Sequence, residues 1–483
     1  MKICIYLWAL PAVAFLLVGA AWVGAGAEAD ISKAPSTGSG QALPQQAYVW
    51  QRTWSGPVQA AIGAQATNFA RLILLHAEMQ SVQGGANPNP RLVRVPIDFQ
   101  ALPRQGTPVG LALRVGPYPG PFAQDDPMAR RLTDLAESLV TEARTNGVLP
   151  VELQIDFDCA ESKLEGYRQW VTALRRRVGP LPVVITVLPA WLRQKAFREL
   201  AGACDGYVLQ VHSLERPQRV ETPFTLCDPV KARAAVSQAS RLGFPFRIAL
   251  PTYGYVVGFD AKGDFIGLSA DGSSRRWPAG TQLREVNANP RELAGLVGEW
   301  LRKPPPFCQG LIWYRLPVAQ ENLNWPFATL SMVMSGRSPT VRLRLEAHRS
   351  EAGGHRPPLQ SAAGGGTSAT LVEVEWVNSG TATKVGPAQV NVRWRNSRLV
   401  AGDGLYGFAL SETGLTSARL SNHLARLLPD ERQRIGWLRF NQETEVELEM
   451  DLEQEQEPKP QQRPEQGRGP TRQPAAEPRP AKR

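Results

Sequence analysis

Cysteine and histidine are scarce in this chain, with five residues of each among 483. There is no Cys-x-x-Cys pair and no Cys/His spacing typical of zinc, so we expect no metal site. No Gly-x-Gly-x-x-Gly or P-loop pattern follows an apolar run, so we expect no nucleotide cofactor. The net charge is +10, but Arg and Lys are scattered and form no basic stripe with aromatic residues. We therefore expect no nucleic-acid partner.

The N-terminus has the pattern of a secretory signal. Lys2 precedes the uncharged apolar stretch Ile3–Val23, and the small residues Ala25–Ala27 suit a cleavage site. We expect residues 1–27 to be a signal peptide, residues 28–46 to be a linker, and the protein to be periplasmic or secreted. An uncleaved membrane anchor is the alternative, because the apolar stretch is nearly long enough to span a bilayer. Contact with a membrane is expected only through this segment.

Eight apolar, β-rich runs recur between residues 47 and 317, and helix-like segments separate most of them. This alternation predicts an α/β fold with a parallel sheet. Eight units favour a closed (β/α)8 TIM-type barrel over residues 47–336. Residues 80–108 carry no convincing helix, and residues 256–289 form a long insertion whose Gly-rich turns suggest a hairpin. The runs are Ala47–Trp54, Ala70–Met79, Val109–Tyr118, Val151–Cys159, Leu181–Pro189, Asp205–Leu214, Phe246–Tyr255 and Gln309–Pro317.

The composition changes after the barrel. Residues 337–452 contain runs in which polar and apolar residues alternate, separated by turns, which predicts a small antiparallel, β-sandwich-like domain. Within it, residues 349–370 are rich in Gly, Ser and Pro and are expected to be flexible. Residues 453–483 are Glu, Gln, Pro and Arg with almost nothing apolar, which predicts a disordered tail.

The fourth run carries an unusual set of polar residues. Side chains alternate along a strand, so its apolar residues should face the helices while Glu152, Gln154, Asp156 and Asp158 point into the barrel. Buried carboxylates are costly without a partner or a function. One interpretation is an internal salt-bridge layer with Arg residues. The other is a functional site for Asp156 and Asp158, because active sites in this fold lie at the C-terminal ends of the strands.

Other strands offer groups that suit a saccharide. The same alternation places Gln210 with His212 and Arg247 with Tyr253, and it leaves His76, Glu78 and Arg114 as further candidates to turn inward. Aromatic rings beside carboxylates suit sugars, whose CH faces stack on rings while their hydroxyls take hydrogen bonds. Core packing is the alternative for each Trp. The expected saccharide-binding residues are Trp50, Arg52, Gln154, Gln210, His212, Glu215, Tyr253, Trp313 and Tyr314.

Several of these runs resemble known barrels. QIDFDC (Gln154–Cys159), LPTYGY (Leu250–Tyr255) and GLIWY (Gly310–Tyr314) resemble strands of chitinase-like glycosidase barrels. LQIDFDC, LPAWL and LQVHSLERP (Leu209–Pro217) more closely resemble a secreted bacterial family known as domain of unknown function 3142. That resemblance covers about residues 47–336. It implies a barrel but no established activity.

The chitinase pattern is D-x-D-x-E, whose last Glu is the proton donor. Asp156 and Asp158 match the two Asp positions, Ala160 stands at the Glu position, and Glu161 follows one residue later. Glycoside hydrolysis needs two carboxyl groups. We therefore consider Asp156, Asp158 and Glu161 as catalytic candidates, with Glu215 or Glu78 as a further partner.

Three functions remain open. The first is a glycoside-hydrolase-like barrel that acts on an extracytoplasmic polysaccharide. The second is a polysaccharide-binding barrel that has lost the acid. The third is a structural envelope protein. A metal-dependent deacetylase, with His76 and His212 as ligands, has less support because no tight ligand spacing accompanies them.

The barrel topology restricts cysteine pairing. Cys159 and Cys227 follow strands and should lie near the mouth, whereas Cys204 and Cys308 precede strands and should lie near the base. A strand of about 17–20 Å separates the two ends, and a disulfide needs Cα atoms within about 7 Å. Disulfides are therefore expected only as Cys159–Cys227 and Cys204–Cys308. Four buried thiols are the alternative.

Overall fold

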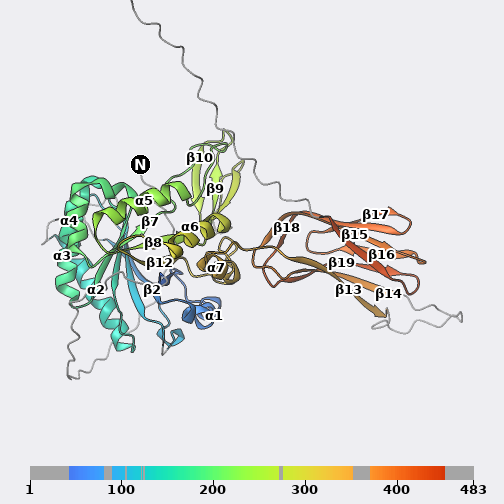
Figure 1. The fold of residues 1–483 in the computed structure, drawn as a ribbon, viewed down its shortest axis with the longest axis horizontal. Coiled ribbons are helices and arrows are strands. Elements are labelled where there is room, and N and C mark those ends of the chain that lie inside the picture. The colour runs from blue at the N-terminus through green and yellow to red at the C-terminus, as the bar shows by residue number, and fades with distance from the viewer. Residues whose placement is uncertain are drawn as a thin grey trace, which may run out of the picture. The chain divides into compact units, whose positions relative to one another are not determined.

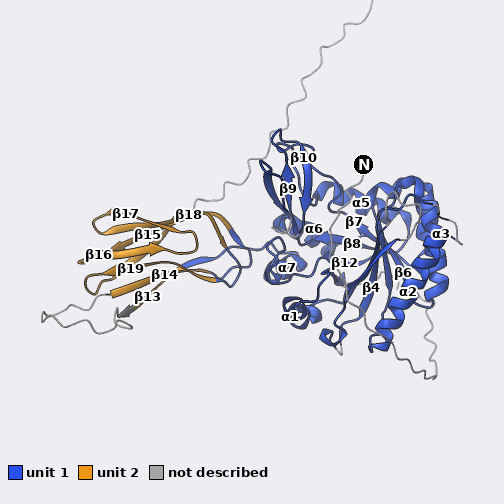
Figure 2. Ribbon diagram, turned by 180° about the vertical axis from the view of Figure 1, so that it is seen from behind, with its two compact units in different colours: residues 1–344, 378–384, 427–431 blue, residues 345–377, 385–426, 432–483 orange. Residues whose placement is uncertain are grey.

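The computed structural model describes residues 43–80, 90–103, 106–120, 122, 126–270, 276–351 and 370–451. The predicted signal peptide and the predicted tail lie outside the described residues. The chain divides into two compact units (Figure 2). The first holds the residues up to 344 together with the short segments 378–384 and 427–431, and the second holds the rest of the C-terminal part. Each unit is described by itself.

The first unit is a closed parallel barrel (Figure 1). The strand order is β1-β12-β8-β7-β6-β5-β4-β2, and β2 pairs with β1 to close the ring. This confirms the predicted fold class, and each strand falls within or overlaps one of the eight predicted runs. The strands are β1 (Gln45–Val49), β2 (Arg71–Gln80), β4 (Val109–Val115), β5 (Leu153–Phe157), β6 (Val183–Val187), β7 (Tyr207–Gln210), β8 (Phe246–Pro251) and β12 (Cys308–Tyr314).

Helices surround the strands. They are α1 (Gly56–Gln65), α2 (Pro127–Thr145), α3 (Leu164–Val178), α4 (Lys195–Ala203), α5 (Pro229–Leu242), α6 (Pro290–Arg302) and α7 (Phe327–Met334). Three of them begin alike. The side chains of Asp126, Asp228 and Asn289 accept hydrogen bonds from backbone amides of the first turn, and proline follows each. The acceptor satisfies amides that the helix leaves unpaired, and proline needs no such partner.

Two loops depart from strict strand–helix alternation, where the sequence indicated they would. Between β2 and β4 the described residues form no α-helix; they form β3 (Arg91–Arg94), antiparallel to β2, and a short 3-10 turn at Phe99–Ala101. After β8 the chain forms β9 (Gly254–Phe259), β10 (Phe265–Ser269) and β11 (Gln282–Asn287). These three make a separate antiparallel sheet in the order β10-β9-β11. The predicted hairpin is therefore a three-stranded sheet.

The second unit is antiparallel throughout. Its two four-stranded sheets have the orders β13-β14-β19-β16 and β17-β18-β15-β20, as expected for a sandwich. Strand β13 extends into the segment expected to be flexible, and residues 352–369 lie outside the described ones. The strands are β13 (Leu343–Glu351), β14 (Thr370–Asn378), β15 (Lys384–Trp394), β16 (Leu399–Gly404), β17 (Ala409–Gly414), β18 (Ser417–Leu427), β19 (Arg432–Phe440) and β20 (Val446–Asp451).

The layer between β5 and the helices fixes which way β5 faces. The Phe157 ring lies 5.1 Å from that of Tyr167 and 5.4 Å from that of Trp170, both on α3. All three side chains are fully buried. Phe157 therefore belongs to the apolar layer outside the barrel, and its neighbour Asp156 takes the opposite face.

No helix in the part of the chain that the structure describes is long and apolar enough to cross a membrane.

Candidate functional site at the barrel mouth

A row of polar side chains crosses adjacent strands at the C-terminal end of the barrel. Glu78 on β2 is the register partner of Arg114 on β4, and Arg114 is the partner of Asp156 on β5. Thr186 on β6 continues the row, because its hydroxyl donates to Asp156 Oδ1 at 2.8 Å. Neighbouring residues at one level of a sheet face the same way, so the predicted inward direction of Asp156 is what the structure shows.

Opposite charges alternate along this row. Arg52, in the loop after β1, donates to Glu78 at 2.7 Å. Arg114 lies 3.9 Å from Glu78 and 3.6 Å from Asp156, distances that describe ion pairs rather than hydrogen bonds. Burial alone would lower the pKa of Arg114, but the charge of Asp156, followed by those of Glu78 and Asp158, raises it above its usual value. The Arg114 guanidinium therefore stays charged between the two carboxylates.

Aromatic rings fill the barrel beside this row. Tyr314 lies 5.4 Å from Trp50, 5.3 Å from Tyr253 and 5.8 Å from His212, with the His212 ring nearly parallel. All four were among the expected saccharide-binding residues, and their rings lie together in the structure. His212 and Tyr253 are buried, whereas Tyr314 is partly exposed. Of these rings, Tyr314 is thus the one best placed to meet a ligand.

Hydrogen bonds link the inner members of this aromatic cluster. Tyr253 and Tyr255 hydroxyls lie 3.0 Å apart, and Ser213 bonds the Tyr255 hydroxyl at 2.8 Å. Burial lowers the pKa of His212 to about 3, so its imidazole is neutral near pH 7. Burial also raises the pKa of Tyr253 and of Tyr255. The cluster is therefore uncharged at neutral pH, and the mouth charge comes from the carboxylates and arginines.

The remaining carboxylate candidates lie at the rim. Asp158 follows β5 and is exposed, and its charge acts on both Arg114 and Tyr255. Glu161 lies in a short 3-10 turn before α3 and accepts a hydrogen bond from Gln194. Glu215 pairs with Lys231 at the start of α5, on an exposed surface. Asp158 is therefore the candidate most directly coupled to the row at the mouth.

Several predicted residues take other positions. Trp313 is fully buried, donates to Gln45 at 2.7 Å and packs against Trp325, so its position does not support a role in saccharide binding. Trp50 does face the cluster, but it is only 4% exposed and presents no open ring face. Gln210 lies at the end of β7 and donates to the His212 carbonyl.

His76 points away from the barrel interior. It lies 3.5 Å from Glu142 of α2 and near Phe99. The pairing of β2 with β4 shifts by one residue between Leu75 and Ala77. This bulge turns Glu78 inward and His76 outward. The suggested metal pair of His76 and His212 therefore does not form.

The lower polar residues of β5 follow the salt-bridge interpretation. Glu152 accepts from Arg247 at 2.8 Å and pairs with Arg71, while Gln154 accepts from the Tyr48 hydroxyl at 2.7 Å. Gly110 on β4 leaves room for this layer, because a Cβ there would lie 2.9 Å from the Glu152 side chain. Glu152 and Gln154 therefore belong to an internal polar layer near the base of the barrel. The salt-bridge interpretation applies to this end of the run, and the functional-site interpretation applies to the end at Asp156.

Neither predicted disulfide is formed in the structure. Cys204, Cys227 and Cys308 are thiols, and burial raises the pKa of each, to about 11 for Cys204 and about 12 for the other two. Cys204 and Cys308 instead donate weak hydrogen bonds to backbone carbonyls. Buried thiols behave as small apolar side chains, which was the alternative.

Sequence reasoning missed Tyr48, Thr186, Ser213 and Tyr255. Tyr48 shares the face of Trp50, and Thr186 the face of Val184, so alternation along β1 and β6 would have found both. Tyr255 belongs to the inserted sheet and Ser213 to a loop with a positive φ of 55°. Neither position belongs to a barrel strand, so strand alternation could not predict that these side chains face the aromatic cluster.

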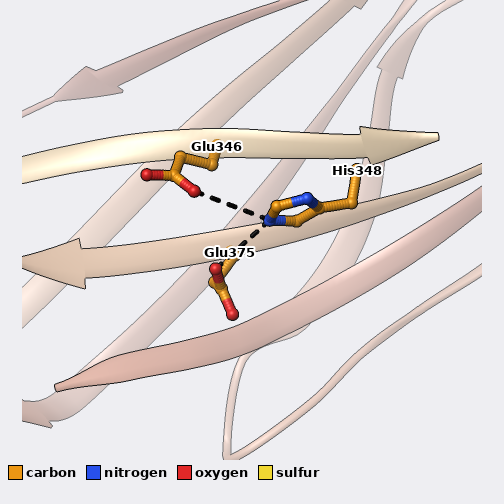
Figure 3. Close-up of side chains that lie close together, drawn as sticks. All are labelled: Glu346, His348 and Glu375. Carbon is orange, nitrogen blue, oxygen red and sulfur yellow. Dashed lines mark hydrogen bonds and ion pairs between the residues drawn. The ribbon is translucent and has the colours of Figure 1, made fainter.

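The described residues of the second unit hold a further cluster of titratable groups. Glu346 and His348 on β13 lie beside Glu375 on β14 (Figure 3). Arg432 on β19 pairs with both carboxylates. A guanidinium thus already supplies the positive charge that a metal ion would bring, and we assign no site here.

Residues 118–319 match the family model described as Domain of unknown function (DUF3142), which confirms the resemblance seen in the sequence for this segment. No curated protein matches the chain.

Similar solved structures include a chitinase from Chromobacterium violaceum ATCC 12472, with 16% identity over 61% of this chain and 98% of that one, and a TM-score of 0.40. The spore cortex-lytic enzyme SleL of Bacillus cereus shows 12% identity over 62% and 75%, with a TM-score of 0.43. The C-terminal domain of a putative chitinase from Desulfitobacterium hafniense DCB-2 shows 14% identity over 61% and 99%, with a TM-score of 0.44. These values describe a distant likeness in fold.

Proposed function

We propose that this chain is an extracytoplasmic carbohydrate-active barrel that binds a polysaccharide at its mouth and cleaves it as a glycoside hydrolase. The observation that carries the proposal is the row Glu78, Arg114 and Asp156, in register across three strands and facing inward at the end where this fold places its active sites. The exposed Asp158 comes directly after β5, and its charge acts on Arg114. An extracytoplasmic location, conferred by residues 1–27, is part of the proposal.

The mouth supplies the two carboxyl groups that glycoside hydrolysis needs. Thr186 donates a hydrogen bond to Asp156 and Arg114 pairs with it, whereas Asp158 reaches solvent. We assign Asp158 as the group that exchanges a proton with the substrate, and Asp156 as the carboxylate that stabilises developing positive charge.

A second candidate function is binding without cleavage. The observation that favours it is the position of Glu161, the third catalytic candidate, which is exposed and hydrogen-bonded to Gln194. Without Glu161, the mouth carboxylates are Glu78, which Arg52 binds, and Asp156 and Asp158. Tyr314 and the charged Arg114 would still hold a saccharide.

The test is a glycan array together with a polysaccharide-hydrolysis screen of the secreted chain. Binding with release of reducing ends supports hydrolysis, and binding without product supports the second candidate. We expect D158N to keep its fold and its polysaccharide binding but to release no product. D134N, on the exposed face of α2, is the matched control and should keep full activity. If the chain neither binds a polysaccharide nor releases product, both candidates are refuted and a structural role in the envelope is favoured.

A further inference from the structure

A polar cavity lies at the end of the barrel opposite the mouth. It has a volume of about 390 Å³ and is lined by residues at the start of the strands, among them Gln46, Arg71, Glu152, Asp205 and Arg247. Its volume is within the range of about 300–1,000 Å³ that small-molecule sites occupy. In this fold the base carries no catalytic residues. The cavity is therefore distinct from the mouth.

Positive charge exceeds negative charge in this cavity. Arg71 and Arg247 share a single carboxylate, Glu152. The other acid, Asp205, is already paired through both oxygens with Arg175. Glu152 and Arg247 are each only 5% exposed, so water screens the excess charge poorly. An uncompensated charge in such a place is unfavourable unless an anion accompanies it.

The two arginines also have donors to spare. Arg247 uses only its Nη1 atom, donating to Gln46 at 2.7 Å and to Glu152 at 2.8 Å. The Nε atom of Arg71 is buried and has no hydrogen-bond partner among the described residues. Burial, and then the charge of Arg247, lowers the pKa of Arg71. The cavity thus offers N–H donors and positive potential but few matching acceptors.

We propose that this base cavity, defined by Gln46, Arg71, Glu152 and Arg247, is a binding site for a small oxyanion of the phosphate or carboxylate class. Arginine presents paired N–H donors that match two oxygens of either group. The ligand would lie beside Glu152, against the Nε atom of Arg71 and the N–H groups of Arg247 that Glu152 and Gln46 leave, and it would bring further acceptors. The site does not depend on the function proposed for the mouth.

The test is calorimetric titration of the full chain with inorganic phosphate at low ionic strength, with acetate as the carboxylate probe and chloride as the blank. Saturable binding of phosphate or acetate is expected, and the stronger of the two identifies the class. R71Q should weaken that binding about tenfold or more, because a charge-assisted hydrogen bond contributes about 1.5–3 kcal/mol. Glu152 keeps Arg247 as its partner in R71Q, so the barrel should still fold.

The matched control is R52Q. Arg52 and Arg71 are similarly exposed, at 33% and 28%, and each pairs with a glutamate that is 5% exposed, but Arg52 lies at the mouth. R52Q should therefore leave anion affinity unchanged. R71K is a second variant, which keeps the charge but removes Nε, and it should bind with an intermediate affinity. Absence of binding in the wild type, equal affinity in R71Q, or loss in R52Q alone would overturn the proposal.

Discussion

Phe157→Ala tests the orientation of β5, on which the candidate site depends. The ring is fully buried and packs against Tyr167 and Trp170 on α3. Burying a phenylalanine removes at least about 150 Å² from water, which at about 25 cal/mol per Å² is worth about 4 kcal/mol. Large-to-small changes of this kind cost about 3–5 kcal/mol in well-packed cores. We therefore expect F157A to destabilise the barrel by about 4 kcal/mol.

The assay is thermal unfolding of the full chain followed by circular dichroism. For a unit of this size, each kcal/mol corresponds to about 2 °C, so the barrel transition should fall by about 8 °C. D158N, one residue further along on the exposed side, should shift it by less than about 1 °C, because exposed substitutions usually change stability by about 0.5 kcal/mol or less. A large shift in D158N with none in F157A would show that Phe157 faces the mouth, and the argument for the site would fail.

Two further predictions follow from buried groups. The pKa of His212 is lowered by burial to about 3, so below pH 6.5 only the unfolded state takes up its proton. Stability should fall by about 2 kcal/mol between pH 7 and pH 5, and urea unfolding of H212F, which lacks this group, should show a correspondingly smaller fall. Trp313→Phe removes the hydrogen bond to Gln45 and should cost about 1–2 kcal/mol. It should leave polysaccharide affinity within twofold, and a larger loss would place Trp313 in the site.

Local patterns were sufficient to predict the barrel. Apolar runs of strand length and the amphipathic segments between them are patterns among residues close together in the chain. Eight such strand–helix units are the number that closes a barrel. The starts of α2, α5 and α6 are equally local, because the capping contact of each Asp or Asn spans only a few residues. Alternation also placed Asp156 inside, since a period of two follows from the backbone itself.

The same rule failed where the backbone departs from regular pairing. A one-residue bulge in β2 puts His76 and Glu78 on opposite faces, although regular alternation places residues two apart on the same face. The location of the bulge depends on how β2 pairs with β4, which no local pattern in the sequence indicates. Trp313 and Tyr314 are adjacent on β12 and were predicted to act together. One step along a strand reverses direction, so Tyr314 joined the mouth while Trp313 packed outside the barrel.

By itself, then, the sequence determined the repeating units, the inward face of β5 and the change to an antiparallel unit after the barrel. Those features depend on short-range periods and on hydrophobicity. Only the tertiary structure decided how the polar residues in and beside β5 divide between the two ends of the barrel. Glu152 meets arginines from β2 and β8 at the base, and Asp156 meets Arg114 and Thr186 at the mouth. These partners are 30 or more residues away in the chain, and closure of the ring is what brings their charges together.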